Sequence, residues 1–152
     1  LAVRGPTGCR YLNNPDRQAG YVNDDWNYTG DAYIRDGDGY FHYQARTDDM
    51  IISAGYNISG PEVEAVLLEH VAVAECAVVG APDPQRGEIV KAYVVLRDSA
   101  TADAAMVKIL QDHVKATVAP YKYPRAVEFI DELPKTQTGK IQRFVLRQKN
   151  IG

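Results

Sequence analysis

Three short polar segments of the 152-residue chain hold side chains whose type and spacing could support chemistry. The first is Tyr28-Thr29-Gly30-Asp31, in which a carboxylate directly follows a glycine. Because glycine lets the backbone and a ligand approach closely, this carboxylate could accept two hydrogen bonds from the diol of a ribose. An Asp after a Gly is also a common turn or cap residue, so the segment alone leaves both interpretations open.

The second segment is Arg46-Thr47-Asp48-Asp49, one basic residue followed closely by two acids. It could be a surface ion-pair cluster, which contributes under about 1 kcal/mol. It also joins two regions of different pattern, and charged, non-periodic residues at such a join can change backbone angles without opening a core. A hinge is therefore the alternative interpretation.

The third segment, residues 134–140, ends in Gly139-Lys140. A Gly before a Lys on an exposed loop makes the backbone flexible at that point, so the lysine side chain is a mobile cation that could reach a phosphate or a carboxylate. The segment is not a P-loop, because Ile141 follows the lysine where that motif needs Ser or Thr. A polar loop that caps a basic helix is the other interpretation.

The chain is most basic toward its C-terminus. Residues 115–152 carry 8 Lys and Arg against 3 Asp and Glu, whereas residues 1–114 carry 9 against 17, for a net charge of −3. The spacing of Lys140, Arg143 and Arg147 predicts one positive helix face. Such a segment suits a phosphate-bearing small molecule, although a solvated helix has the same composition. The net charge argues against general nucleic-acid binding.

Residues 1–45 have the pattern of short strands and turns without a helix. Asn13-Asn14-Pro15 is interpreted as a chain breaker, and Asp36-Gly37-Asp38-Gly39 predicts a hairpin turn between strands at 31–35 and 40–44. The stretch has too few apolar residues for a core of its own. We therefore expect it to be the edge of a larger domain.

From about residue 50 the pattern alternates between strands and helices. Ser59 and Glu62 have capping-box spacing before an apolar stripe, and a second amphipathic helix is expected over 103–118 with a short helix from about 141. Strands are expected at 50–53, 73–79, 89–96 and 126–130, with a loop at 80–88. The expected fold class is α+β, a small three-stranded sheet flanked by helices.

Composition narrows the class of protein further. Apolar residues make up 45% of the chain and charged residues 24%, as in ordinary globular domains. The apolar runs are too short for a membrane helix, and no Cys or His spacing matches a zinc site. Two cysteines cannot make a disulfide framework, so we expect a reducing, cytoplasmic location and no membrane partner.

Taken together and in this order, the three segments resemble motifs of the adenylate-forming superfamily, which includes acyl- and aryl-CoA synthetases, adenylation domains of peptide synthetases, and luciferase. They are similar to Tyr-x-Thr-Gly-Asp, Gly-Arg-x-Asp-Asp and Pro-x-Thr-x-x-Gly-Lys-x-x-Arg. Residues 80–88 also follow the family pattern. The resemblance implies a mobile C-terminal lid over 48–152, preceded by the β-rich edge of the large N-terminal domain over 1–47.

The resemblance also implies chemistry. ATP and a carboxylic acid would form an acyl-adenylate, after which the lid rotates and coenzyme A releases AMP. Asp31 would hold the ribose hydroxyls, Arg46 would support ribose or phosphate, and Asp48 would be the hinge. Lys140 would bridge the carboxylate, the α-phosphate and the ribose, stabilising charge as pyrophosphate leaves. Gly55 would lie beside the pantetheine arm of CoA.

Two positions depart from the family pattern, because Ala45 replaces a Gly and Asn57 stands where many relatives have a phosphate-contacting Arg. Arg86 and the basic helix face are further candidates for holding the phosphates of CoA. The family's phosphate loop, acyl pocket and Mg²⁺-binding acid lie upstream of these motifs. Since the first residue is Leu1, we expect a fragment that is inactive alone and whose partners are the N-terminal domain, ATP, CoA and the acid.

The branch of the family is indicated by Pro61-Glu62-Val63-Glu64 and by Gln142-Arg143, which are more typical of CoA ligases than of peptide-synthetase domains. The segments 9–14 and 55–59 look most like benzoate- and 2-aminobenzoate-CoA ligases. Two alternatives remain at this point: the lid of an adenylation domain that transfers its acyl group to a carrier protein, and a nucleotide-binding module without catalysis.

Overall fold

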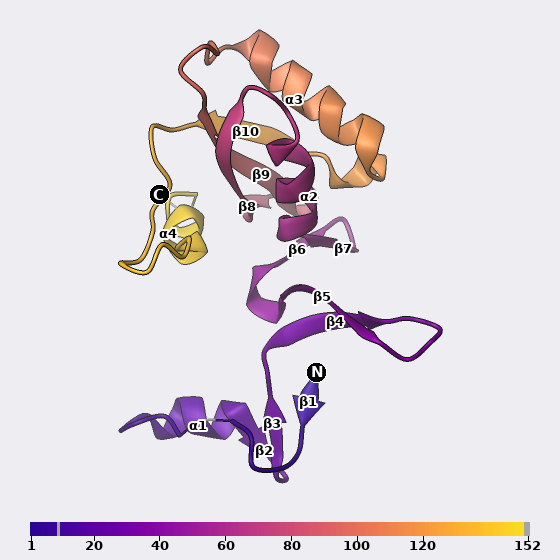
Figure 1. Cartoon of the computed structure of the whole chain (residues 1–152), viewed down its shortest axis with the longest axis vertical. Coiled ribbons are helices and arrows are strands. Elements are labelled where there is room, and N and C mark those ends of the chain that lie inside the picture. The colour runs from indigo at the N-terminus through magenta and orange to yellow at the C-terminus, as the bar shows by residue number, and fades with distance from the viewer. Residues whose placement is uncertain (9, 151–152) are drawn as a thin grey trace. The chain divides into compact units, whose positions relative to one another are not determined.

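The computed structural model describes residues 1–8 and 10–150. The chain divides into two compact units, Leu1–Asp48 and Asp49–Gly152. This division falls one residue after the domain boundary expected between 47 and 48. Each unit is described by itself below, with the element labels of Figure 1.

The first unit contains a small three-stranded antiparallel sheet in the order β1-β3-β2, a β4–β5 hairpin and one helix. The elements are β1 (Ala2–Val3), α1 (Pro15–Tyr21), β2 (Val22–Asn23), β3 (Trp26–Tyr28), β4 (Asp31–Arg35) and β5 (Phe41–Arg46). The hairpin is confirmed, because β4 and β5 pair antiparallel. Its turn is held by Asp36, whose Oδ1 accepts from the backbone N–H of Asp38 at 3.0 Å and of Tyr40 at 2.9 Å.

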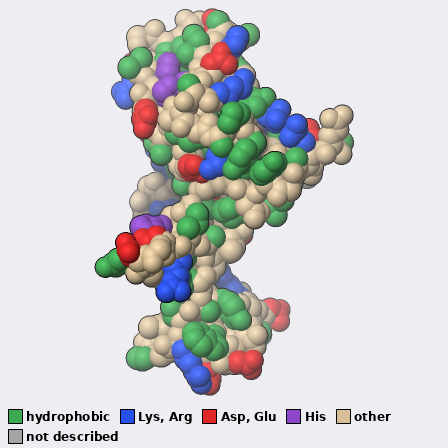
Figure 2. All heavy atoms as spheres, turned by 90° about the vertical axis from the view of Figure 1, so that its right-hand side faces the viewer, with side chains coloured by type: hydrophobic (Ala, Val, Ile, Leu, Met, Phe, Trp, Pro, Cys, Tyr) green, Lys and Arg blue, Asp and Glu red, His purple; other side chains and the backbone are tan. Residues whose placement is uncertain are grey.

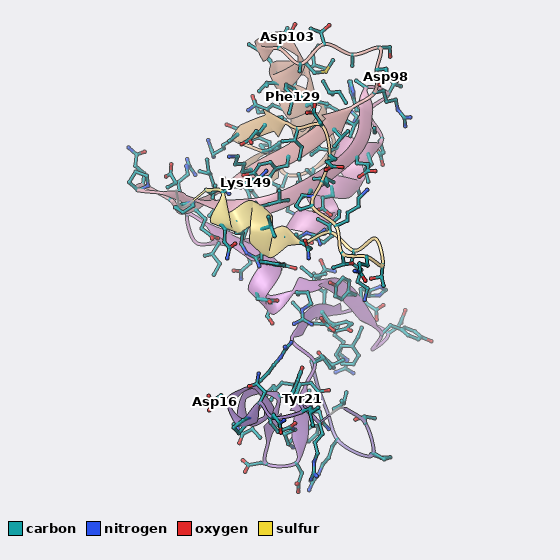
Figure 3. All side chains as sticks on the ribbon, turned by 90° about the vertical axis from the view of Figure 1, so that its left-hand side faces the viewer. Asp16, Tyr21, Asp98, Asp103, Phe129 and Lys149 are labelled. Carbon is teal, nitrogen blue, oxygen red and sulfur yellow. The ribbon has the colours of Figure 1, made fainter. Side chains whose placement is uncertain are left out.

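The expectation that this unit has no helix is wrong. Helix α1 begins at Pro15, and the side chain of Asn14 accepts a hydrogen bond from the backbone N–H of Arg17 at 3.1 Å. Asn at the N-cap and Pro in the first turn start a helix as readily as they end one. Figure 3 labels Asp16 and Tyr21, the acid of the first turn and the last residue of α1.

The second unit is α+β as expected, but its sheet has five strands instead of three. They are β6 (Met50–Ser53), β7 (Tyr56–Ser59), β8 (Val73–Asp83), β9 (Gly87–Leu96) and β10 (Ala126–Phe129). β9 is central, because β8 pairs with it antiparallel along its length and β10 pairs with it parallel. The β6–β7 hairpin joins β9 through one pair, Ser53 with Gly87.

One strand, β7, was not expected, and the end of another, β8, differs from the expectation. β7 follows β6 after only two residues, so its period-2 pattern is too short to stand out from the capping motif of the next helix. The stretch Gly80–Asp83 belongs to β8 and pairs with residues 87–90 of β9, which leaves only Pro84, Gln85 and Arg86 as the loop. Pro82 is tolerated there at the end of an outer strand.

Helices cover both faces of the sheet. They are α2 (Gly60–Leu68), α3 (Ala104–Thr117) and α4 (Arg143–Gln148), with short 3-10 turns η1 (Thr47–Asp49) and η2 (Pro120–Lys122). Along β8, Cys76 and Val78 pack in one core with α2 and α3, whereas Ala77 and Val79 pack in the other with Leu146 of α4. Figure 1 shows α4 across the sheet from α2 and α3. Burial on both faces explains the nearly continuous apolar sequence of β8.

The predicted starts of α2 and α3 are confirmed, whereas α4 begins at Arg143, two residues later than expected. Ser59 caps α2 by accepting from the backbone N–H of Glu62 at 3.4 Å, and Asp103, labelled in Figure 3, caps α3 by accepting from that of Met106 at 2.8 Å. Leu110 and Val114 of α3 are fully buried. Among the described residues, no helix combines the length and the apolar character that crossing a bilayer requires.

Candidate functional site

Asp31 and Arg46 face each other at the open end of the β4–β5 hairpin. They are register partners, and Arg46 Nη1 lies 3.7 Å from Asp31 Oδ1. Arg46 Nε also donates to Asp48 Oδ1 at 3.3 Å. The pairing of β4 with β5 therefore brings three predicted site residues from two separate motifs into one charged cluster.

Gly30 permits this arrangement. It has φ +74°, and a Cβ built on it would lie 3.0 Å from Arg46 Nη2. The carbonyl of Gly30 accepts from both the backbone N–H of Thr47 at 2.8 Å and its hydroxyl at 2.7 Å. Any other residue at position 30 would push the guanidinium away and strain the backbone. The two motifs are thus locked together by their backbones.

A hollow of about 550 Å³ opens beside Arg46 in the first unit. It is lined by Tyr11, Arg17, Gly20, Tyr21, Tyr28, Thr29, Gly30, Arg46 and Thr47. Arg17 lies 4.4 Å from the centre of the Tyr11 ring, which packs edge-on against Tyr21. Two guanidinium groups among tyrosine rings form a surface suited to a planar or anionic group.

Gly55 and Arg86, both predicted to contact CoA, lie close together in the second unit. Ala54 and Gly55 form the two-residue turn of the β6–β7 hairpin with φ +50° and +83°, as a type I′ turn requires. The backbone N–H of Ala54 donates to the carbonyl of Arg86 at 2.9 Å. Nothing lies within 4 Å of a Cβ built on Gly55, so the turn presents open space.

An aromatic pair adjoins this turn. The rings of Tyr56 and Tyr121 stack with centroids 4.4 Å apart, and both side chains are exposed. Lys122 next to them is paired with Glu62 at 2.6 Å. Asn57, which stands where many relatives have a phosphate-contacting Arg, is exposed on β7. The sequence analysis did not predict this pair. The sequence feature that could have indicated it is a tyrosine next to each of two turn-forming segments.

Lys140 is presented on a hydrogen-bonded loop. The carbonyl of Lys140 accepts from the backbone N–H of Thr136 at 2.8 Å, and its own N–H donates to the Thr136 hydroxyl at 3.1 Å. Lys135 and Ile141 form an isolated antiparallel bridge at the base of the loop. The Lys140 side chain is exposed, and the described residues include no carboxylate paired with it.

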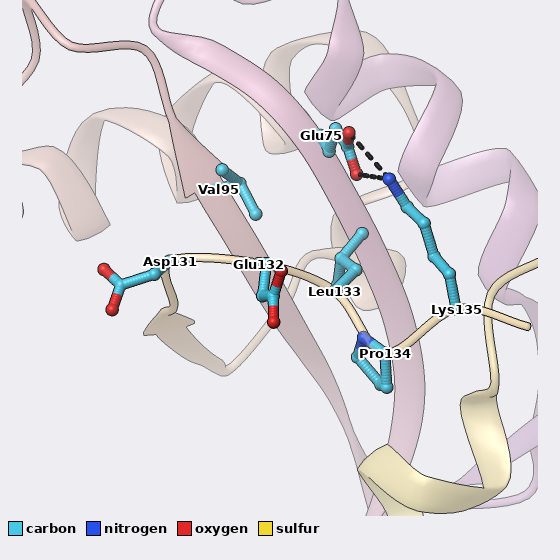
Figure 4. Close-up of a pocket in the computed structure, with 7 residues that line it drawn as sticks. All are labelled: Glu75, Val95, Asp131, Glu132, Leu133, Pro134 and Lys135. Carbon is cyan, nitrogen blue, oxygen red and sulfur yellow. Dashed lines mark hydrogen bonds and ion pairs between the residues drawn. The ribbon is translucent and has the colours of Figure 1, made fainter. Parts of the chain in front are cut away.

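A hollow of about 380 Å³ next to this loop does not suit a phosphate (Figure 4). Three of the side chains that line it are acidic, Glu75, Asp131 and Glu132. Its one cation, Lys135, is already held by Glu75 at 2.6 Å, as the dashed lines in Figure 4 show. The negative charge of this surface would repel an anionic ligand.

The predicted positive helix face is wrong. Lys140 precedes α4 and so lies on the loop, and the two arginines of the helix are neutralised by acids. Arg143 binds Glu64 with contacts of 2.6 to 3.2 Å, and Arg147 binds Asp49 at 2.5 Å. On the face drawn in Figure 2, basic and acidic side chains of the second unit are interspersed.

Glu64 is a structural centre that sequence reasoning missed. Its Oε1 also accepts from the backbone N–H of Val78 at 2.8 Å, which ties α2, β8 and α4 together. Burial and the charge of Glu64 raise the pKa of the Cys76 thiol to about 12. The sequence feature that could have indicated this role is the position of Glu64 among the apolar residues that α2 buries.

A second buried polar group anchors the end of α4. The hydroxyl of Tyr93 donates to Asn150 Oδ1 at 2.7 Å, and Lys91 Nζ donates to the same oxygen at 2.8 Å. Burial lowers the pKa of Lys91, but its hydrogen bonds with Glu128 and Tyr93 outweigh this and raise it. Figure 3 labels Lys149, next to Asn150 at the end of this helix.

The described residues include no group of three or more His, Cys, Asp or Glu side chains that could hold a metal ion. They therefore do not fit a Mg²⁺ site, and no step below is assigned to that ion.

Comparison with known proteins identifies the family. Residues 62–140 match the AMP-binding enzyme C-terminal domain. The mitochondrial acyl-coenzyme A synthetase ACSM4 of Mus musculus is 51% identical over 150 residues, 93% of this chain and 25% of that protein. The uncharacterized acyl-CoA ligase YtcI of Bacillus subtilis is 49% identical over 91% of this chain and 26% of that protein.

A solved structure shows the same fold. The anthranilate CoA ligase AuaEII, in complex with anthranoyl-AMP, superposes with a TM-score of 0.80 at 42% identity, over 91% of this chain and 27% of that one. The chain thus spans about a quarter of the length of the curated relatives it matches. Since the family match covers just over half of its residues, the chain belongs to the family of AMP-binding enzyme C-terminal domains.

Proposed function

We propose that the chain is the C-terminal part of an ATP-dependent, AMP-forming acid–thiol ligase. One observation carries this proposal: of the four cations in residues 134–147, Lys140 is the one that has no acidic partner among the described residues. Its neighbours Lys135, Arg143 and Arg147 are each held by a carboxylate. An exposed lysine on an ordered loop is available to a substrate, whereas the paired cations serve the fold.

Lys140 acts in the first half-reaction. A carboxylate oxygen of the acid attacks the α-phosphorus of ATP, the bond to the β-phosphate oxygen breaks, and pyrophosphate leaves with the electron pair. The ammonium of Lys140 stabilises the negative charge that develops on the phosphoryl oxygens.

Asp31, Arg46 and Asp48 form the part of the site in the first unit. The partly buried carboxylate of Asp31 accepts hydrogen bonds from the ribose hydroxyls, and Arg46 places its positive charge next to ribose or phosphate. Asp48 is the hinge, because it is the last residue of its unit and its side chain is largely exposed, so that a change in its backbone angles opens no core.

The Gly55 turn serves the second half-reaction. The thiol of CoA attacks the acyl carbon, the bond from that carbon to the phosphate oxygen breaks, and AMP leaves. The open space at Gly55 admits the thiol arm, and Arg86 next to it supplies charge for a phosphate of CoA. The fragment alone holds only part of this composite site, so we expect it to be inactive.

We place the acid among aromatic carboxylic acids such as benzoate and 2-aminobenzoate. The resemblance of residues 55–59 to ligases for these acids and the similarity to an anthranilate CoA ligase support this choice. Initial rates of the whole enzyme with benzoate, 2-aminobenzoate and straight-chain fatty acids test it. Higher kcat/KM for the fatty acids would overturn the aromatic assignment and leave the ligase proposal standing.

The test of the ligase proposal is Lys140→Ala in the full-length enzyme, with Lys135→Ala as the matched control on the same loop. We expect acid-dependent pyrophosphate exchange to fall about 100- to 1,000-fold in Lys140→Ala, as after the loss of one transition-state donor. Thioester formation from synthetic acyl-adenylate should persist in both variants. Full adenylate formation by Lys140→Ala would refute the proposal, and transfer to a carrier protein without CoA would redirect it.

A further inference from the structure

Two adjacent carboxylates, Asp48 and Asp49, have partners in different units of the chain. Asp48 pairs with Arg46 within the first unit at 3.3 Å, and Asp49 pairs with Arg147 within the second at 2.5 Å. The side chain of Asp48 is 67% exposed and that of Asp49 only 18%. Solvent therefore weakens the first pair much more than the second.

Arg147 lies on α4, the helix that directly follows the loop of Lys140. The backbone N–H of Gln142, which precedes the helix, donates to the carbonyl of Pro134 at 2.8 Å and closes the loop. A displacement of α4 therefore moves the base of the loop, and the Lys140 ammonium with it.

α4 has six residues, too few for a stable helix on its own. Its position depends on contacts with the rest of the unit. Leu146 is fully buried and its carbonyl accepts from the Tyr93 hydroxyl at 3.3 Å, which fixes the helix against the sheet. The Asp49 pair is the contact that links the helix to the start of β6, directly after the unit boundary.

We propose that Arg147 is a positioning residue for Lys140. Its pair with Asp49 ties α4 and the Lys140 loop to the first residue beyond the hinge, so that a change in the backbone angles of Asp48 carries Lys140 with it. This inference rests on the proposed function, in which Lys140 is needed for adenylation and not for the thiol step.

The experiment is a double-mutant cycle in the full-length enzyme with Arg147→Met and Lys140→Ala. Arg147→Met should lower kcat for adenylation about 10- to 100-fold, as expected for a misplaced charge, with little change in KM for the acid. Thioester formation from synthetic acyl-adenylate should not change. Because Arg147 acts through Lys140, the same substitution should add no loss in the Lys140→Ala background.

Controls separate this role from stability. Lys108→Met removes an exposed pair with Asp112 on α3 and should leave both half-reactions intact. Arg147→Lys should restore most of the adenylation rate. If Arg147→Met unfolds at the assay temperature, Asp49→Asn takes its place in the cycle, because the amide keeps the shape and removes the charge.

Three results would overturn the inference alone: unchanged adenylation in folded Arg147→Met, equal losses in both half-reactions, or the same loss with and without Lys140. A wild-type enzyme that forms no acyl-adenylate would overturn the proposed function, and this inference with it.

Discussion

Replacing Arg143 by Met tests how the ion pair with Glu64 holds α4 in place. The guanidinium makes three hydrogen bonds to the carboxylate, two to Oε1 at 3.2 and 2.8 Å and one to Oε2 at 2.6 Å. The Glu64 side chain is only 12% exposed, so Met would leave a carboxylate shielded from water with the Val78 N–H as its donor. Breaking a buried pair from one side costs about 3 to 5 kcal/mol. Since Arg143 itself is partly exposed, we expect about 3 kcal/mol, a large share of the about 5 to 15 kcal/mol that a domain has.

The assay is urea unfolding of the 152-residue chain, followed by circular dichroism at 222 nm. Fluorescence of the only tryptophan would not serve, because Trp26 lies in the first unit. The matched control is Arg143→Met with Glu64→Gln, since the neutral amide still accepts from Val78 and carries no charge to shield. The double variant should recover about 2 kcal/mol of the loss. A loss under about 1 kcal/mol for Arg143→Met, or no recovery in the double variant, would refute the reasoning.

Three further predictions follow from local geometry. Gly55→Ala places a side chain at φ +83° in open space, so unfolding free energy should fall by about 1 kcal/mol, and a loss above about 2 kcal/mol would show an unrecognised contact. In a Cys9→Ser chain, Cys76 should resist thiol reagents at pH 8 until denaturant is added, because burial and Glu64 raise its pKa to about 12; labelling at the rate of a free thiol would contradict this. The hydrogen bond from His42 lowers the pKa of Asp36 below its ordinary 3.8, so the hairpin gains stability above that pH and loses it as pH falls through the lower folded value. Removing the bond by His42→Ala should therefore raise the Asp36 pKa toward 3.8 in an NMR titration, and an unchanged midpoint would disprove the cause.

Features set by a few neighbouring residues were predictable from the sequence. The turn held by Asp36 and the cap formed by Ser59 each depend on contacts within four residues, so the local pattern contains the whole interaction. The same local signals mislead when one motif has two uses. Asn14-Pro15 starts a helix where a chain break was expected, because Asn and Pro satisfy the open backbone groups at a helix start.

The partners of the charged residues were not predictable, since they are far apart in the sequence. Arg143 and Glu64 are 79 positions apart, and Arg147 and Asp49 are 98 apart. The spacing of the basic residues indicates which side of a helix their side chains leave from. It contains no information about the acidic residues that the fold brings next to them. The positive face inferred from that spacing was therefore wrong.

That correction strengthens the role assigned to Lys140. With Lys135, Arg143 and Arg147 each paired with a carboxylate within the second unit, Lys140 is the exposed cation of residues 134–147 that no acid of the described residues neutralises. Neither arginine can replace Lys140 without first breaking its own shielded ion pair, and breaking that pair costs more free energy than an exposed contact with the ligand would return. The loss on Lys140→Ala should for this reason be large and not rescued by the adjacent arginines. Arg147 should in turn affect adenylation through the position of that lysine and not through its own charge.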